Sequence, residues 1–257
     1  MAAIGLAACG SGESGRAASD GQDDLSALEA QLAENREGLP DEAPSAEKVK
    51  PRSVLEAVRD DQQLGFFAGQ DPTDVAAVAE RTYRRDWGKP LKIATRYDEL
   101  ELLRNDRDRV WFQDIEADVL EGNESYALVF QEWARISRGA FKPSNVRERW
   151  SGENDPVEIS FDLAGQRHTV QAQPQGDFYD LCVLTGGINP VIKASGKHFA
   201  LWGPDADLGQ EAFVVVLTER EQYELEQAGW SFATGDEMRA AFGYGQTSEL
   251  GDAAPCA

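Results

Sequence analysis

The aromatic side chains of this chain all lie after residue 65, and this distribution limits where a hydrophobic core can form. The 6 Trp, 6 Tyr and 11 Phe residues begin at Phe66. Aromatic side chains supply much of the area that a core buries, so residues 1–65 lack the material for a core of their own. We therefore expect a single globular domain at residues 64–245, large enough to bury its core without disulfides or metals.

The segment before this domain has the composition of a tether. It opens with a Gly/Ser-rich stretch at residues 10–15, and three prolines follow among charged residues: Pro40, Pro44 and Pro51. Such segments behave as flexible spacers. Leucines at helical spacing within residues 25–38 favour one marginal helix. We expect residues 9–63 to form an acidic flexible tether and residues 246–257 a flexible C-terminal tail.

The first residues carry a motif of another kind, Leu6-Ala7-Ala8-Cys9. It resembles the lipobox of bacterial lipoproteins, with residues 1–8 as a truncated signal peptide. The resemblance implies that Cys9 carries a thioether-linked diacylglycerol, which would hold the chain at a membrane surface in the cell envelope. The alternative is a cytoplasmic chain in which the cysteine has no such role. The globular domain itself shows no motif of a family that we recognise.

Capping residues and apolar spacing predict several helices in the domain. Asp71 as N-cap and Pro72 at the first helical position predict a helix that runs to Arg85. Apolar spacing, glycine stops and a capping box at Thr218 predict further helices at residues 97–104, 126–139, 188–195 and 218–229. Within the second of these, residues 127–130 also fit a strand.

Alternating apolar and polar residues predict strands in the second half. Residues 157–163 and 166–172 flank an Ala-Gly turn and should form a half-buried hairpin. Residues 197–202 and 212–217 suggest a second antiparallel pair. The last of these strands is almost wholly apolar, so we expect it to be covered on both faces. The fold class is therefore α+β, with antiparallel hairpins packed with several helices and preceded by a disordered N-terminal tether.

The balance of charge bears on partners. The formal net charge is −21. Such a charge disfavours nucleic acid and anionic lipid headgroups and favours a basic protein as a partner. Solubility, or a saline habitat, would also account for the acidity.

The three cysteines allow one disulfide outside the cytoplasm. If Cys9 is lipidated, Cys182 and Cys256 remain as a pair that would tie the C-terminal tail to the domain. Cys182 lies in the apolar stretch at residues 181–184, where a buried free thiol is the alternative.

Signatures of catalysis and of cofactor binding are missing from the sequence. The only histidines are His168 and His198. The residue spacings typical of zinc sites, of phosphate-binding loops and of the Gly-x-Ser-x-Gly turn of serine hydrolases do not occur. We assign no catalytic residue, metal or cofactor. Trp150 and Trp202 are candidates for exposed anchors that contact a partner.

These observations predict a lipid-anchored bacterial cell-envelope protein whose α+β domain binds or inhibits without catalysis. The membrane would be contacted through the lipid on Cys9. Two alternatives stay open. One is an immunity-type protein that neutralises a basic toxin by charge-steered capture. The other is an envelope hydrolase that uses a carboxylate pair or His168.

Overall fold

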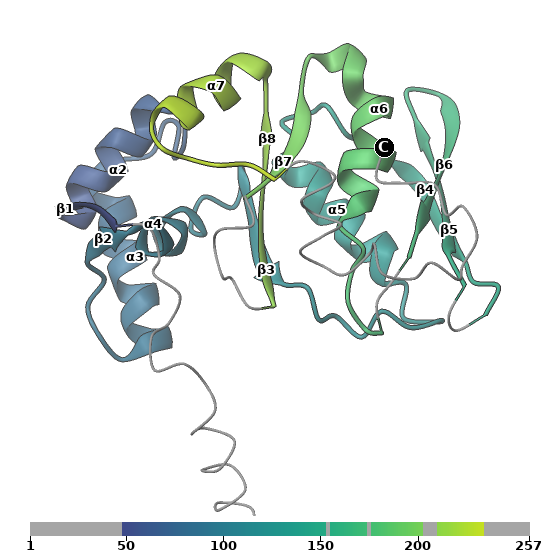
Figure 1. Ribbon diagram of the computed structural model, residues 1–257, viewed down its shortest axis with the longest axis horizontal. Coiled ribbons are helices and arrows are strands. Elements are labelled where there is room, and N and C mark those ends of the chain that lie inside the picture. Colours follow the sequence, from purple (N-terminus) through teal and green to yellow (C-terminus); the bar gives the residue numbers. More distant parts are fainter. Residues whose placement is uncertain (1–47, 153–154, 174–175, 203–209, 234–257) are drawn as a thin grey trace, which may run out of the picture. The chain divides into compact units, whose positions relative to one another are not determined.

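A computed structural model of the chain describes residues 48–152, 155–173, 176–202 and 210–233. These residues form an α+β domain in which helices pack around three antiparallel sheets, which confirms the expected fold class (Figure 1). Cys9, the leucine-containing helix expected at residues 25–38, Cys256 and the tail at residues 246–257 lie outside the described part of the chain. No helix among the described residues has both the length and the apolar character needed to cross a bilayer.

Strand β8 (Glu211–Leu217) is the middle strand of the central sheet. It pairs with β3 (Val110–Asp114) on one side and with β7 (His198–Leu201) on the other, both antiparallel. Every residue of β8 after Glu211 is buried. The expectation that this strand is covered on both faces is therefore confirmed.

The side chains of β8 alternate between two hydrophobic clusters. Those in the first cluster are Ala212, Val214 and Val216, and those in the second are Phe213, Val215 and Leu217. Successive residues of a strand point to opposite faces of its sheet. The central sheet is therefore a wall that both clusters share.

One face of the central sheet is covered by the elements of the first cluster, which lie on the right in Figure 1. These elements are α5 (Ser125–Ile136), the sheet of β4 (Ser144–Arg149), β5 (Val157–Leu163) and β6 (Gln166–Ala172), the π-helical turn η1 (Val183–Ile188), α6 (Asn189–Ile192) and the 3-10 turn η2 (Lys193–Ser195).

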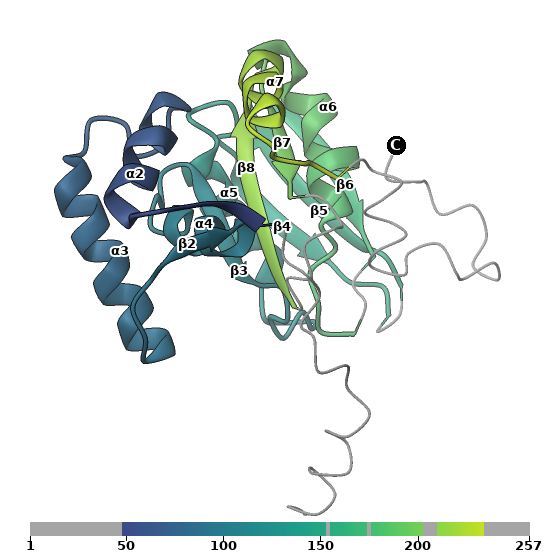
Figure 2. The ribbon, with the colours of Figure 1, turned by 60° about the vertical axis from the view of Figure 1, so that its left-hand side comes forward.

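The other face is covered by the second cluster. Its elements are β1 (Lys48–Arg52), α2 (Val54–Gln63), α3 (Pro72–Trp87), β2 (Ile93–Thr95), α4 (Arg96–Leu103) and α7 (Glu219–Gln227). Figure 2 shows β1 running across the front of this group, where it pairs with β2. From α7 only Leu225 is buried in the cluster.

The predicted local structure agrees with these elements at many positions. The hairpin of β5 and β6 has the expected register, with Phe161 opposite His168. Its turn residues Ala164 and Gly165 both have positive φ, 51° and 79°, as a tight hairpin turn requires. The helices expected after Asp71 and after Thr218 are also confirmed, each with its predicted N-cap.

The expected boundary of the tether at residue 63 is wrong, because β1 and α2 belong to the domain. Ser53 and Glu56 form a capping box that starts α2. Val54 and Val58 are buried in the second cluster, at 3% and 0% exposure. The segment has no aromatic residue, but its small aliphatic side chains pack on the aromatic residues that follow.

Helix α7 is joined to the end of α5 through Glu221. The Glu221 carboxylate accepts hydrogen bonds from Arg138 Nη1 at 2.6 Å and Nη2 at 2.7 Å, and from the Thr218 backbone N–H at 2.8 Å. Burial by itself would raise the pKa of Glu221. The hydrogen bonds from Arg138 and Thr218 outweigh burial and lower this pKa to about 2.

We predict that Glu221→Gln lowers the free energy of unfolding at pH 7 by up to about 3 kcal/mol. The pKa of Glu221 is lower in the folded chain than its usual value of 4.5. Its ionised form therefore stabilises the fold above pH 4.5, and this contribution is lost as the pH falls towards 2. Urea denaturation should show a difference from the wild type at pH 3 that is less than half of that at pH 7. Glu219→Gln, exposed in the same helix, is the control. An equal difference at both pH values would contradict the prediction.

Candidate functional site

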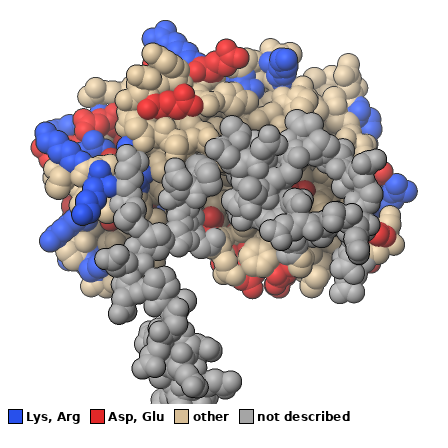
Figure 3. Space-filling model, viewed as in Figure 1, with Lys and Arg blue, Asp and Glu red and all other residues tan. Residues whose placement is uncertain are grey.

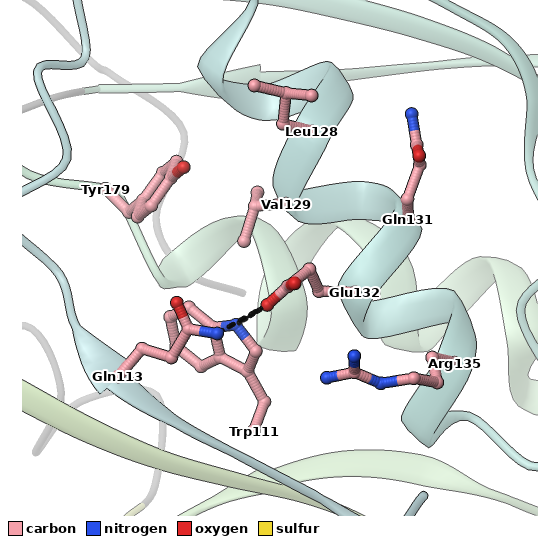
Figure 4. Close-up of a pocket in the computed structure, with 8 residues that line it drawn as sticks. All are labelled: Trp111, Gln113, Leu128, Val129, Gln131, Glu132, Arg135 and Tyr179. Carbon is pink, nitrogen blue, oxygen red and sulfur yellow. Dashed lines mark hydrogen bonds between the residues drawn. The ribbon is translucent and has the colours of Figure 1, made fainter. Parts of the chain in front are cut away.

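A cleft of about 460 Å³ opens between β3 and α5 (Figure 4). We call it the α5 cleft. Strand β3 contributes side chains to its floor, α5 contributes one long wall, and the segment before Leu181 contributes an aromatic side chain. The residues that matter to its chemistry are Trp111, Gln113, Leu128, Glu132, Arg135 and Tyr179.

Glu132 is the central polar group of the α5 cleft. Its Oε2 atom accepts hydrogen bonds from Trp111 Nε1 at 3.0 Å and from Gln113 Nε2 at 2.6 Å. Figure 4 shows these side chains converging on the one carboxylate. The other oxygen, Oε1, makes no hydrogen bond with a described residue. Glu132 can therefore accept a further hydrogen bond from a ligand in the cleft.

Aromatic rings form the floor and the far wall of the cleft. Trp111 is 1% exposed, and its ring lies edge-on to Trp133 and Tyr179, with centroids 6.0 and 6.4 Å away. The Tyr179 hydroxyl donates to the Ser125 carbonyl at 3.2 Å. Burial, with the nearby Glu132 and Glu148 carboxylates, raises the pKa of Tyr179 to about 12. The Tyr179 hydroxyl is thus neutral at physiological pH, and its packed ring forms part of the cleft wall.

The sequence around the cleft is strongly acidic. From Val110 to Ala134 the chain has six acidic residues and no Lys or Arg. Five of the six are exposed, and we call them the acidic rim: Asp114, Glu116, Asp118, Glu121 and Glu124. Two leucines of the same stretch are also exposed, Leu120 at 47% and Leu128 at 58%. Negative charge and exposed apolar side chains therefore occur together in the stretch of chain that includes β3 and most of α5, the two elements that flank the cleft.

The two tryptophans proposed as partner anchors lie away from the α5 cleft. Trp150 is half-buried, packs against the first cluster and donates its Nε1–H to Glu148 at 3.1 Å. Trp202 is 8% exposed and lies in the second cluster, with the ring of Trp230 at 4.8 Å. The expectation of an exposed anchor is therefore wrong for Trp202, because neighbouring aromatic rings enclose it.

The two histidines do not contribute to the cleft. His168 is half-buried, stacks on Phe161 at 5.6 Å and makes no hydrogen bond with a described residue. His198 Nε2 lies 2.6 Å from Gln222 Oε1. Within the described ranges, no three His, Cys, Asp or Glu side chains gather as metal ligands would.

Cys182 is half-buried at the start of η1 and is disulfide-bonded. Both other cysteines, Cys9 and Cys256, lie outside the described part of the chain, so the pairing with Cys256 stays a prediction. The Cys182 backbone N–H donates to the Asp180 carboxylate at 2.8 Å. Burial raises the pKa of Asp180 to about 6, against the hydrogen bonds from Gln173 and Cys182.

Comparison of the chain with protein-family models, with curated proteins and with solved structures finds no match. The chemistry of the α5 cleft must therefore be inferred from its own residues. An aromatic floor, a carboxylate oxygen with spare capacity and an acidic rim suit a cationic ligand with an apolar part. No motif in the sequence predicted this cleft, although the stretch from Val110 to Ala134, which has no Lys or Arg, was a usable signal.

We predict that Glu132→Ala lowers the free energy of unfolding by about 1–3 kcal/mol, because the buried Trp111 Nε1–H then has no acceptor. Glu132→Gln retains an amide oxygen and should cost less. Urea denaturation at pH 7 measures both. Gln131→Ala, an exposed neighbour on α5, is the matched control. The interpretation of Glu132 fails if its alanine variant is as stable as that control.

Proposed function

We propose that this chain is a lipid-anchored protein of the bacterial cell envelope and that its α+β domain binds a protein partner without catalysis. The α5 cleft carries this proposal. Its acidic rim and exposed leucines suit a basic segment with an aliphatic or aromatic side chain. Such a side chain would contact Leu128, and a Lys or Arg beside it would donate to Glu132 Oε1.

The contribution of charge to this binding is local. The described residues include 29 acidic and 22 basic side chains, a modest excess. Around the α5 cleft, Arg135 is the one basic side chain among the lining residues, against the five acidic side chains of the acidic rim. Opposite charges steer a partner towards its site and raise the association rate, and salt reduces this effect.

The contents of the cleft favour binding over hydrolysis. Glu132 is the one carboxylate among the residues that line it, and Glu132 already accepts two hydrogen bonds. A carboxylate pair that works as acid and base needs a second acid across the bound substrate. His168, the other candidate for the hydrolase alternative, lies on β6 and is not among the lining residues.

An immunity-type protein is the kind of binding protein that these features fit best. Such a protein must capture a basic toxin quickly and hold it. The acidic rim supports fast capture, and the exposed leucines with the aromatic floor support retention once the apolar contact forms.

The anchor is a separate part of the proposal and depends on the lipobox-like motif that ends at Cys9. We predict that Cys9→Ser moves the protein from the membrane fraction to the soluble fraction of its native host, because the thioether-linked lipid cannot form. Mass spectrometry of the N-terminal peptide should find a diacylglyceryl cysteine in the wild type. Cys256→Ser, which removes a cysteine outside the motif, should stay with the membrane. A wild-type peptide that begins unmodified at Met1 and is recovered from the soluble fraction would contradict the anchor.

The cleft can be tested with a fluorescein-labelled peptide of lysines and leucines as a model cationic ligand. We predict that the triple change Asp114→Asn, Glu116→Gln and Glu121→Gln slows its association about tenfold at low ionic strength. The control removes three exposed charges from α7 instead: Glu219→Gln, Glu224→Gln and Glu226→Gln. Stopped-flow anisotropy measures both. Equal slowing in the two triple variants would show that only net charge matters, which contradicts a site at the α5 cleft.

A further inference from the structure

A second cleft, of about 600 Å³, lies on the other side of the domain, where β1, α2, α4 and the end of α7 meet. We call it the β1 cleft. It differs from the α5 cleft because buried charges line it. The residues that carry its chemistry are Lys48, Lys50, Arg52, Asp61, Arg96 and Glu99.

Glu99 holds the two arginines of the β1 cleft in place. It is 1% exposed, and its carboxylate accepts hydrogen bonds from both Arg52 and Arg96. Arg96 also donates to the carbonyls of Ala228 and Gly229, at 3.1 and 3.0 Å. The guanidinium groups are therefore fixed by protein contacts, as in a preorganised binding site.

Three polar atoms in the β1 cleft have hydrogen-bonding capacity that the described protein groups do not use. They are Asp61 Oδ2 and the Nε atoms of Arg52 and Arg96, all buried without a partner. Asp61 is 2% exposed. Buried polar atoms in proteins nearly always have a hydrogen-bond partner. Three of the seven exceptions among the described residues belong to side chains that line this one cleft, which points to a group that binds there.

The charge state of Asp61 indicates what kind of group this is. Burial first, and then the Glu99 carboxylate and Asp60, raise the pKa of Asp61 well above its usual range, while Arg52 and Arg96 oppose the shift. The shift favours the protonated form of the Asp61 carboxyl, whose O–H can donate a hydrogen bond. All three unused groups are then donors, and donors require an acceptor as ligand.

The surroundings of the β1 cleft are basic. Residues 48–96 include ten basic and seven acidic side chains, whereas the described residues after 96 include 12 basic and 22 acidic ones. Figure 3 shows Lys and Arg gathered over the end of the domain that holds β1, α2 and α3. Lys48 and Lys50 are exposed and line the cleft. The lining residues thus include four basic side chains, Lys48, Lys50, Arg52 and Arg96, against the carboxyl groups of Asp60, Asp61 and Glu99. This excess of positive charge favours a negatively charged ligand.

We propose that the β1 cleft binds an oxyanion, a phosphate or carboxylate group, with Arg52 and Arg96 as the main donors. Asp61 supplies a further hydrogen bond, and Lys48 and Lys50 attract the ligand at the mouth. The oxyanion belongs either to a small soluble molecule or to a lipid headgroup. This site is independent of the α5 cleft and of the partner proposed for it.

The test uses the full chain with Cys9→Ser, so that no lipid anchor contributes to membrane binding. Calorimetry measures the binding of inorganic phosphate and of acetate, and cosedimentation measures binding to phosphatidylglycerol vesicles. We predict that Arg52→Gln weakens binding at least tenfold and that Lys48→Gln with Lys50→Gln weakens it several-fold. The control is Arg81→Gln with Arg84→Gln, two exposed positions of α3 that do not line the cleft.

Each outcome decides the proposal. Binding of a free ion that the Arg52 variant loses supports a soluble ligand. Binding to vesicles alone, with the same loss, supports a lipid headgroup. No binding to any of the three probes, or an equal loss in the α3 control, overturns the proposal. If Arg52→Gln fails to fold, the double variant Lys48→Gln with Lys50→Gln provides the test, because both positions are exposed. Unchanged phosphate binding in the acidic-rim triple variant would separate this site from the α5 cleft.

Discussion

The burial of β8 on both faces is the condition on which the rest of the domain depends. A strand covered on one face needs a single packed layer, but β8 sends Val214 to one cluster and Val215 to the other. Strand β3 does the same with Trp111 and Phe112. Both layers must therefore be complete before the sheet is covered. The α5 cleft lies in the layer of the first cluster, with Trp111 of β3 among its lining residues, and the β1 cleft lies in the layer of the second cluster.

Arginine side chains fix several helix ends to neighbouring parts of the domain. Arg96 reaches the carbonyls at the end of α7, and Arg138 reaches both Glu221 and the Val216 carbonyl, at 2.8 Å for the latter. Arg109 lies over the ring of Phe66 at 4.8 Å, and a Cβ atom on Gly65 would lie 2.5 Å from its Nη1 atom. Gly65, with φ of +88°, has a backbone conformation that favours glycine, and a larger side chain there would also displace the end of the Arg109 side chain.

Local signals in the sequence predicted much of the fold but little of the sites. The Ala164-Gly165 turn, the Thr218 capping box and the apolar run of β8 depend on nearby residues, and all three predictions are confirmed. Strands β1, β2, β3 and β4 were not predicted. The pairing of β1 and β2 joins residues more than 40 positions apart, and no local sequence pattern predicts such a pairing. The same holds for the contact between Arg52 and Glu99, which lie 47 positions apart in the sequence.

The net charge of the chain and the charge of its sites are different quantities. Of 46 acidic and 25 basic residues, the described part holds 29 and 22, so most of the formal excess of acid belongs to residues outside it. Charges act on a partner within a screening length of about 8 Å at physiological salt. A basic partner at the α5 cleft would therefore respond to the acidic rim, whereas an oxyanion at the β1 cleft would respond to Lys48, Lys50 and the two arginines. A strongly acidic chain can thus have a basic site, because screening limits the charges that act on a bound ligand to those near its cleft.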